Sequence, residues 1–275
     1  MTNAQYVVIG NPIAHSKSPL IHTNFAQQTQ QALNYETLLV DTKIGAFQQA
    51  IADFQKNNGK GCNITVPFKQ EAWQLATQRQ PRAEKAGAVN TLWFEQGRII
   101  GDNTDGVGLV RDLVHNHQCQ ITGKRLLILG AGGAVRGVLS PLLAEKPTQC
   151  VIANRTVSKA ETLAEIFADE GKITPTSFTA LAGQQFDIII NGTSASLQGE
   201  LPPLPDNMFA KNAWAYDMMY GAKPTPFMTW ATQHGATQIL DGLGMLVEQA
   251  AESFYLWRGV RPKTQPIIEL VRSQL

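Results

Sequence analysis

Cysteine is scarce in this sequence of 275 residues: only Cys62, Cys119 and Cys150 occur, far apart and never as a C-x-x-C pair. An odd number at such spacing predicts neither a disulfide framework nor a zinc site, so all three are interpreted as reduced thiols. The five histidines show no metal-ligand spacing beyond His115 and His117, which fall in a polar loop. No metal is expected, and all five histidines are treated as non-catalytic.

An excess of charge of either sign is also missing. The chain has 23 Lys and Arg against 22 Asp and Glu, a net charge of +1, which gives no bulk attraction to nucleic acid or anionic lipid. No apolar run approaches the roughly 18 residues of a membrane span, and the start, MTNAQYVVIGNPIAH, lacks the basic and apolar segments of a signal peptide. We expect a cytoplasmic protein with no nucleic-acid or membrane partner.

Hydrophobic residues are abundant by comparison. They make up 43% of the chain and charged residues 16%, a balance that excludes a disordered chain. At roughly 100 to 200 residues per domain, the length predicts one large or two modest domains.

The first hundred residues alternate short apolar runs with amphipathic ones, in the order β-α-β-α-β that is typical of a parallel sheet. A turn at Gln96 and Gly97 predicts a hairpin that closes this unit. The expected strands are 6–10, 35–40, 63–66, 89–95 and 98–101, and the expected helices are 19–33 and 45–57.

A second alternation begins near Arg125 and predicts a doubly wound, Rossmann-type unit. We expect residues 1–102 with 245–275 to form a discontinuous substrate-binding and catalytic domain, and 103–244 a dinucleotide-binding domain. The expected strands are 125–129, 150–153, 187–190 and 214–218; the expected helices are 107–114, one from the glycine turn to before Pro147, 159–168, 245–258, and a short one after Pro262.

A glycine-rich turn follows the first strand of the second unit. Gly130-Ala131-Gly132-Gly133-Ala134 stands between an apolar strand and an apolar helix, where free amides and the helix dipole bind a pyrophosphate. The third fingerprint position is Val135 in place of glycine. An ordinary strand-to-helix turn is the alternative, but the position inside a β-α-β unit favours dinucleotide binding.

The next strand ends in Asn154-Arg155-Thr156, followed by Lys159, with no acidic residue in the turn. An NAD site usually has Asp or Glu there, whereas two cations suit the 2′-phosphate of NADP. A solvated helix start is the alternative interpretation of Arg155 and Lys159.

Polar residues in the first unit indicate a binding site less specifically than the glycine turn does. Ser18 is predicted to cap a helix that has Pro19 at its first position, yet Ser16 and Ser18 together also suit a carboxylate at the helix start. Thr65 and Lys69 follow a strand, where ligands of parallel sheets bind. The alternatives are a solvated surface group for Lys69, turn residues for Asn90 and Asp105, and a structural amide for Gln249.

Taken together and in order, these motifs resemble the shikimate dehydrogenase family nearly from end to end. The motifs are SKSP at 16–19 with His22, NITVPFK at 63–69, GAVNT at 87–91, DNTDG at 102–106, GAGGA at 130–134, NRT at 154–156, YDMMY at 216–220 and DGLGMLVEQAA at 241–251.

This resemblance implies an α/β fold of two domains with a cleft between them, and reversible NADP-dependent reduction of 3-dehydroshikimate to shikimate, in chorismate and aromatic amino acid biosynthesis. It implies Lys69 and Asp105 as the catalytic pair. The implied substrate contacts are Ser16, Ser18, Thr65, Asn90, Tyr220 and Gln249. The implied cofactor contacts are Gly130, Ala131, Gly132, Gly133, Ala134, Asn154, Arg155, Thr156, Lys159, Met218 and Gly242. A homodimer is a family-level expectation only.

Two positions depart from the family pattern. Thr23 stands where Asn is frequent, and Lys159 stands where Arg is frequent. A lysine ammonium binds a phosphate less specifically than a guanidinium does. Lys159 therefore makes the predicted preference for NADP over NAD less exclusive. The alternatives are a paralogue that also accepts quinate or NAD, and a sensor that binds ligands without turnover. Retention of both Lys69 and Asp105 argues against the sensor.

Overall fold

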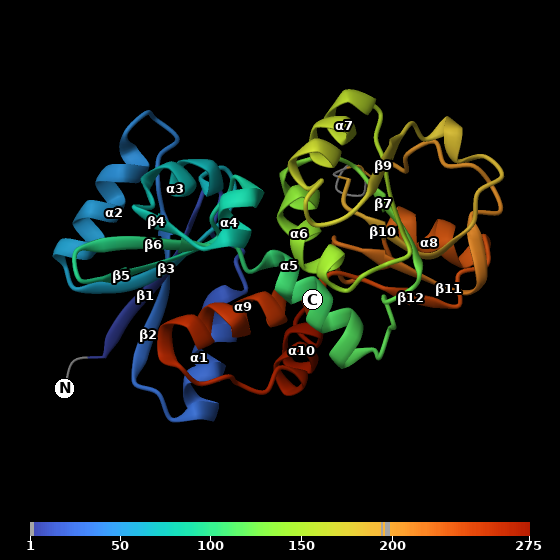
Figure 1. Ribbon diagram of the computed structural model, residues 1–275. Coiled ribbons are helices and arrows are strands. Elements are labelled where there is room, and N and C mark those ends of the chain that lie inside the picture. The colour runs from blue at the N-terminus through green and yellow to red at the C-terminus, as the bar shows by residue number, and fades with distance from the viewer. Residues whose placement is uncertain (1–2, 194, 196–198) are drawn as a thin grey trace. The chain divides into compact units, whose positions relative to one another are not determined.

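The computed structural model describes residues 3–193, 195 and 199–275. The chain forms two compact units, which Figure 1 shows. Unit 1 comprises Met1–Gly108 and Val247–Gln274, and unit 2 comprises Leu109–Leu246 with the terminal Leu275. Unit 1 is therefore built from two segments that are far apart in the sequence. Within the described part of the chain, no helix combines the length and the apolar character that a bilayer crossing requires.

Unit 1 contains a mixed sheet in the order β2-β1-β3-β5-β6-β4. Strands β1, β2 and β3 pair in parallel, whereas β5 and β6 form the predicted antiparallel hairpin. The strands are β1 (Ala4–Gly10), β2 (Leu33–Leu39), β3 (Gly59–Ile64), β4 (Gln78–Arg79), β5 (Thr91–Glu95) and β6 (Arg98–Asp102). The helices are α1 (Ser18–Thr29), α2 (Ala46–Lys56), α3 (Lys69–Leu75), α4 (Pro81–Ala86), most of α9 (Leu243–Arg258) and α10 (Gln265–Arg272).

Alternation along β1 decides which helices cover which face of this sheet. Val7 and Ile9 belong to the core cluster that contains Phe47 and Ile51 of α2. Tyr6 points to the other face, where its ring stacks on Trp257 of α9 at 4.6 Å between centroids. Accordingly, α2 and α3 lie on one side of the sheet and α1 and α9 on the other (Figure 1).

Unit 2 contains a sheet in the order β12-β11-β10-β7-β8-β9, with every pair parallel. The strands are β7 (Arg125–Leu129), β8 (Gln149–Ala153), β9 (Ile173–Thr176), β10 (Phe186–Asn191), β11 (Phe209–Asp217) and β12 (Gln238–Leu240). The helices are α5 (Asp105–Arg111), which enters this unit from unit 1, a π-helical turn (Asp112–Asn116), α6 (Gly133–Ala144), α7 (Val157–Ile166), a short 3₁₀ turn (Thr179–Leu181) and α8 (Pro226–Gln233).

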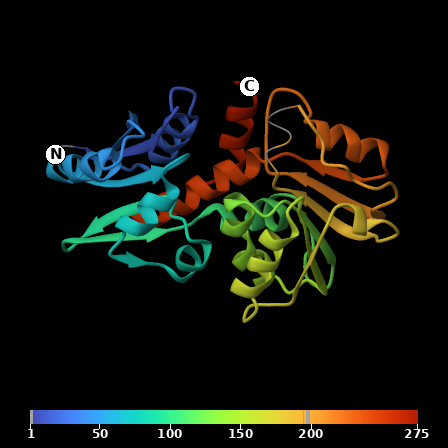
Figure 2. The ribbon, with the colours of Figure 1, turned by 90° about the horizontal axis from the view of Figure 1, so that it is seen from above.

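The two faces of this second sheet are covered by different helices, as expected of a doubly wound fold. Leu126 and Ile128 belong to a core cluster with Val138 of α6, whereas Leu127 belongs to the cluster with Phe227 of α8. Figure 2 shows the strands of unit 2 between α6 and α7 on one side and α8 on the other. The predicted α/β class with two parallel-rich sheets is confirmed.

The start and the end of α1 differ from the prediction. The helix begins at Ser18, with Lys17 at the N-cap position and no side-chain cap, so the prediction that Ser18 caps it was wrong. Ser18 is instead buried and contacts Tyr35, while Ser16 Oγ accepts a hydrogen bond from the Ser18 backbone N–H at 3.3 Å. The helix ends at Thr29 because Gln30 adopts the left-handed conformation, with a φ of 56°, and Leu33 already belongs to β2.

Candidate active site and cofactor site

Lys69 and Asp105 form an ion pair in unit 1. Lys69 is the first residue of α3, which follows β3 after a short loop, and Asp105 is the first residue of α5, which follows β6 after a turn. Lys69 Nζ donates to Asp105 Oδ2 at 2.6 Å, and both side chains are only partly exposed. The two groups therefore form a short charge-assisted hydrogen bond between an ammonium and a carboxylate.

Asn90 holds this pair in place from the end of the loop before β5. Its Nδ2 donates to Asp105 Oδ1 at 2.8 Å, to Thr104 Oγ1 at 2.9 Å and, more weakly, to Gln249 Oε1 at 3.3 Å. The structure thus brings together predicted site residues from positions 69, 90, 105 and 249. Gln249 also accepts from Thr104 Oγ1 at 3.3 Å, so this amide has partners within the same group of side chains.

A buried polar network beneath these residues was not predicted from the sequence. Asn63 accepts a hydrogen bond from the Tyr35 hydroxyl at 2.7 Å and donates to Ser253 Oγ at 3.0 Å. Ser253 in turn contacts Thr91 Oγ1 at 2.7 Å. The signal that could have found it is the presence of polar residues inside otherwise apolar strands, since buried polar side chains need partners. The network links β2, β3, β5 and α9.

Ser16, Ser18 and Thr65, the predicted binders of the substrate carboxylate and a hydroxyl, follow β1 and β3 along the chain. Thr65 follows β3 and packs against Gly10 at the end of β1, where an added Cβ would lie only 2.4 Å from the Thr65 methyl group. Ser18 reaches the same network through Tyr35. His22 stacks on the Tyr35 ring at 4.2 Å, and burial lowers the pKa of this imidazole to about 3, so it is neutral.

In unit 2, the glycine turn has the geometry of an anion site. Gly130 has a φ of 102°, a conformation that favours glycine. Gly132 and Gly133 are exposed, and a Cβ added to either would meet nothing within 4 Å. The first amides of α6 have no side-chain cap. Open backbone with free N–H groups at a helix start fits the pyrophosphate of a dinucleotide.

Val135 occupies the third fingerprint position, where glycine is usual, and it packs closely against Gly192 instead. Val135 is fully buried, and a Cβ added at Gly192 would lie 2.4 Å from its Cγ2 atom. The close contact between helix and sheet that the third glycine usually permits is therefore made possible here by Gly192, at the end of β10.

The turn after β8 presents its predicted cations to solvent. Arg155 and Lys159 are exposed and have no ion pair among the described residues. Asn154 Nδ2 donates to the Thr156 carbonyl at 2.8 Å and so fixes the turn that carries Arg155. Two accessible cations on a shaped turn fit a phosphate group on a ribose.

Met218, Gly242 and Tyr220 lie near the ends of β11 and β12. A Cβ added at Gly242 would lie 2.2 Å from the Met218 carbonyl oxygen, so only glycine permits this close approach of the two segments. Met218 is buried, whereas Tyr220 is 37% exposed. Burial and the nearby Asp241 carboxylate raise the pKa of the Tyr220 hydroxyl, which therefore stays protonated and can donate.

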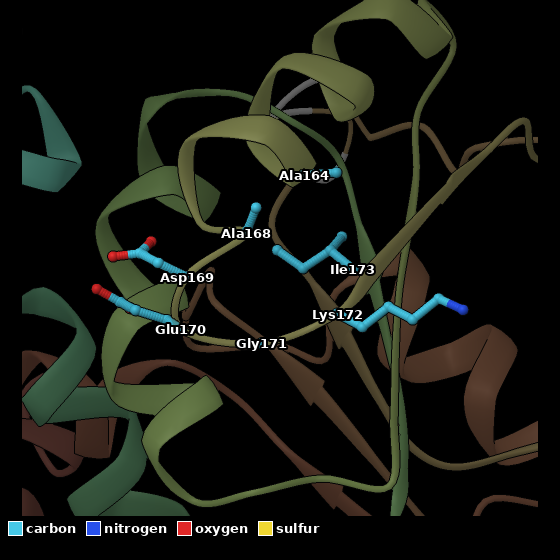
Figure 3. Close-up of a pocket in the computed structure, with 7 residues that line it drawn as sticks. All are labelled: Ala164, Ala168, Asp169, Glu170, Gly171, Lys172 and Ile173. Carbon is cyan, nitrogen blue, oxygen red and sulfur yellow. The ribbon is translucent and has the colours of Figure 1, made fainter.

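A separate pocket of about 430 Å³ lies at the opposite end of α7, around Ala168 and Ile173 (Figure 3). It is at the amino end of β9, whereas ligands of open parallel sheets bind beyond the carboxyl ends. Figure 3 shows Asp169 and Glu170 pointing away on one side and Lys172 on the other, so these charges do not converge on a ligand. Among the described residues, no group of three or more His, Cys, Asp or Glu is arranged to hold a metal.

Comparison with known protein families gives three consecutive matches along the chain. Residues 8–92 match the shikimate dehydrogenase substrate binding domain. Residues 112–198 match the shikimate / quinate 5-dehydrogenase family, and residues 242–272 match the shikimate 5'-dehydrogenase C-terminal domain.

Similar proteins agree over nearly the full length. The NADP(+) shikimate dehydrogenase of Alkalilimnicola ehrlichii is 58% identical, over 98% of this chain and 99% of that protein. The structure of an Ael1 enzyme from Pseudomonas putida is 46% identical, with a TM-score of 0.92 over 98% of both chains. Shikimate 5-dehydrogenase from Thermus thermophilus, solved with NADP(H) and shikimate, is 29% identical, with a TM-score of 0.86 over 99% of this chain and all of that one. These matches show that the chain belongs to the shikimate dehydrogenase family.

Proposed function

We propose that this protein is an NADP-dependent oxidoreductase acting on a CH–OH group, and that it reversibly reduces 3-dehydroshikimate to shikimate in chorismate and aromatic amino acid biosynthesis. The observation that carries the proposal is the Lys69–Asp105 ion pair, held by Asn90 in a chain whose relatives are named for this activity. The same relatives and the solved complexes with NADP support the choice of cofactor.

In the proposed chemistry, Lys69 and Asp105 transfer one proton to or from the substrate oxygen. When bound, NADPH would supply a hydride to the ketone carbon of the substrate, and the protein would have to stabilise the negative charge that develops on the oxygen. Lys69 Nζ, which donates to Asp105 Oδ2 at 2.6 Å, and this carboxylate are the groups proposed to stabilise the oxygen and to protonate it. In the reverse direction the same pair accepts the hydroxyl proton. Asn90 fixes Asp105 by binding its other oxygen, so the carboxylate has one orientation toward Lys69.

The remaining predicted residues are assigned to binding. Ser16, Ser18 and Thr65 are proposed to bind the substrate carboxylate and a hydroxyl, because they are uncharged donors that follow β1 and β3 along the chain, and ligands of open parallel sheets bind beyond the carboxyl ends of strands. Asn90, Gln249 and Tyr220 are proposed as further substrate contacts. Of these, the Asn90 and Gln249 amides are already oriented by hydrogen bonds, which lowers the entropy lost on binding.

The cofactor is proposed to lie along unit 2. Gly130, Ala131, Gly132, Gly133 and Ala134 would bind its pyrophosphate, since this turn leaves backbone N–H groups open. Asn154, Arg155, Thr156 and Lys159 would bind the adenosine with its 2′-phosphate. Met218 and Gly242 would border the nicotinamide.

Initial rates followed by nicotinamide absorbance test this function. Shikimate and quinate are each measured with NADP and with NAD, using the wild type beside Lys69→Ala. Turnover with shikimate and NADP that the substitution abolishes is the expected result. Comparable rates with quinate or NAD would assign the protein to a broader paralogue, and ligand binding without turnover would favour a sensor.

Cytoplasmic location and a homodimer are proposed alongside this function. The three cysteines are free and buried, and the absence of a disulfide among them is usual for a protein of a reducing compartment. Sedimentation of the purified chain at several concentrations measures the oligomeric state. A single monomeric species throughout would contradict the homodimer.

A further inference from the structure

We propose that Arg82 is a positioning residue for this reaction, which holds the turn carrying Asp105 and the helix carrying Gln249 in one fixed arrangement. The inference rests on the proposed function, and it assigns a role to a residue that contacts neither Lys69 nor Asp105.

The guanidinium of Arg82, on α4, binds two carboxylates at once. Its Nε donates to Asp102 Oδ1 at 2.8 Å, and its Nη2 donates to Asp102 Oδ2 at 2.6 Å. The same Nη2 donates to Glu252 Oε1 at 3.0 Å. The fork geometry of arginine fixes both the distance and the angle of the Asp102 carboxylate, which a lysine ammonium does not do.

Asp102 connects this guanidinium to Asp105 through hydrogen bonds that involve Asn103. Asp102 is the last residue of β6, and its Oδ1 accepts from the Asn103 backbone N–H at 2.7 Å. Asn103 Oδ1 in turn accepts from the Asp105 backbone N–H at 3.1 Å. The Asn103 amide also donates to the Ala88 carbonyl at 3.1 Å. The turn that presents Asp105 to Lys69 is thus built upon the carboxylate that Arg82 holds.

Glu252 connects the same guanidinium to Gln249. The two residues are three positions apart on α9, so their side chains lie on one face of the helix. Glu252 Oε2 is bound by Arg261, which completes its charge pairing. A rotation of α9 that moved Gln249 away from Asn90 would have to break the Glu252 contact with Arg82.

Asp102 and Glu252 are buried, so their charges need cationic partners. Asp102 is 1% exposed and Glu252 8%, so two carboxylates lie inside unit 1 with two guanidinium groups as their partners. Removal of one cation from a buried group of charges leaves a carboxylate without compensation, and the backbone must shift or admit water. The shift would occur three residues from Asp105.

Substitution of Arg82 by Gln, and separately by Lys, tests the proposal, with Arg79→Gln as the matched control. Arg79 lies three residues earlier, binds exposed Glu84 and packs over the Trp73 ring, and contacts neither Asp102 nor Glu252. Circular dichroism and thermal unfolding establish that each variant folds. Steady-state rates with shikimate and NADP, and the isotope effect with cofactor deuterated at the transferred position, are the readouts.

We expect Arg82→Gln to lower kcat by about tenfold and to increase the isotope effect on kcat, with the KM for NADP nearly unchanged, because a misplaced Asp105 slows the chemical step. Arg82→Lys should recover part of kcat, and Arg79→Gln should alter stability alone. If Arg82→Gln does not fold, Arg82→Lys is compared with Arg79→Lys on the same readouts.

Equal kcat and equal isotope effects in the Arg82 and Arg79 variants would overturn the positioning role while leaving the proposed function intact. An inactive wild type would overturn the proposed function itself, and this inference with it.

Discussion

The candidate sites of the two units are built in different ways. In unit 1, side chains from α3, the loop before β5, α5 and α9 are already joined by hydrogen bonds around Asn90 and Asp105. In unit 2, one local turn offers open backbone at Gly132 and Gly133, and the cations of the next turn are exposed. Catalytic geometry therefore depends on residues distant in sequence, whereas anion binding depends on a short segment.

Lys69→Ala should have the largest effect, and it tests whether the site in unit 1 depends on its preformed ion pair. It removes the cation of a preformed pair, so we expect kcat to fall by about 100- to 10,000-fold, with a much smaller effect on shikimate binding. Initial rates and calorimetric titration with shikimate measure the two quantities. Lys60→Ala, at an exposed position on β3, is the control, and an unchanged kcat for Lys69→Ala would remove this residue from the mechanism.

Arg155→Ala tests the cofactor side. Loss of a charge-assisted contact to a phosphate costs about 1.5 to 3 kcal/mol, so the KM for NADP should rise by roughly ten- to one-hundredfold while the KM for NAD hardly changes. Arg125→Ala, which removes a cation bound to Asp187 in the same unit, should affect neither KM. A parallel rise for NADP and NAD would argue against 2′-phosphate recognition.

Gly192→Ala tests the contact between α6 and the end of β10. The added Cβ would lie 2.4 Å from Val135 Cγ2, so we expect a destabilisation of about 1 to 3 kcal/mol in the free energy of unfolding. Denaturant unfolding measures it. The double variant with Val135→Ala should recover much of that loss, and strictly additive effects would show that the two positions are independent.

His22→Phe examines the buried side of unit 1. Burial lowers the pKa of His22 to about 3, below its ordinary value of 6.5, so the folded state resists the proton that the unfolded chain binds. This contribution to stability is fully present above pH 6.5 and is lost as the pH falls from 6.5 toward 3, by up to about 1.4 kcal/mol per pH unit.

The Phe variant keeps the stacking on Tyr35 and does not titrate, so its free energy of unfolding should depend less on pH over this interval. Urea unfolding at several pH values measures the difference from the wild type. His15→Phe, at an exposed position, is the control, and an identical pH dependence of the wild type and His22→Phe would contradict the prediction.

Local patterns predicted β7, β8, β10 and β11 of the second sheet but missed its edge strands β9 and β12. The strand at Arg125–Leu129 and the glycine turn after it were placed correctly, because apolar runs bounded by glycine depend on neighbouring residues. Short elements were missed: β4 has two residues and β12 three, too few to show a period. The Ser18 cap was mispredicted because tertiary burial against Tyr35 competes with capping.

Long-range polar contacts were beyond sequence reasoning. Arg82 and Glu252 are 170 positions apart, and nothing in either local sequence identifies the other as its partner. Ser253 and Asn63 are also far apart in the sequence, and only the fold shows that they meet. A single sequence shows which residue types are present but not which of them meet across a sheet.

The division of unit 1 into two segments has a consequence for synthesis on the ribosome. Domains usually fold in the order in which they are made. Here the first 108 residues emerge first, yet their sheet lacks the cover of α9 and the Trp257 ring on Tyr6 until residues 247–274 have been translated. Residues 109–246 are complete earlier, so the nascent chain should finish its second unit before its first.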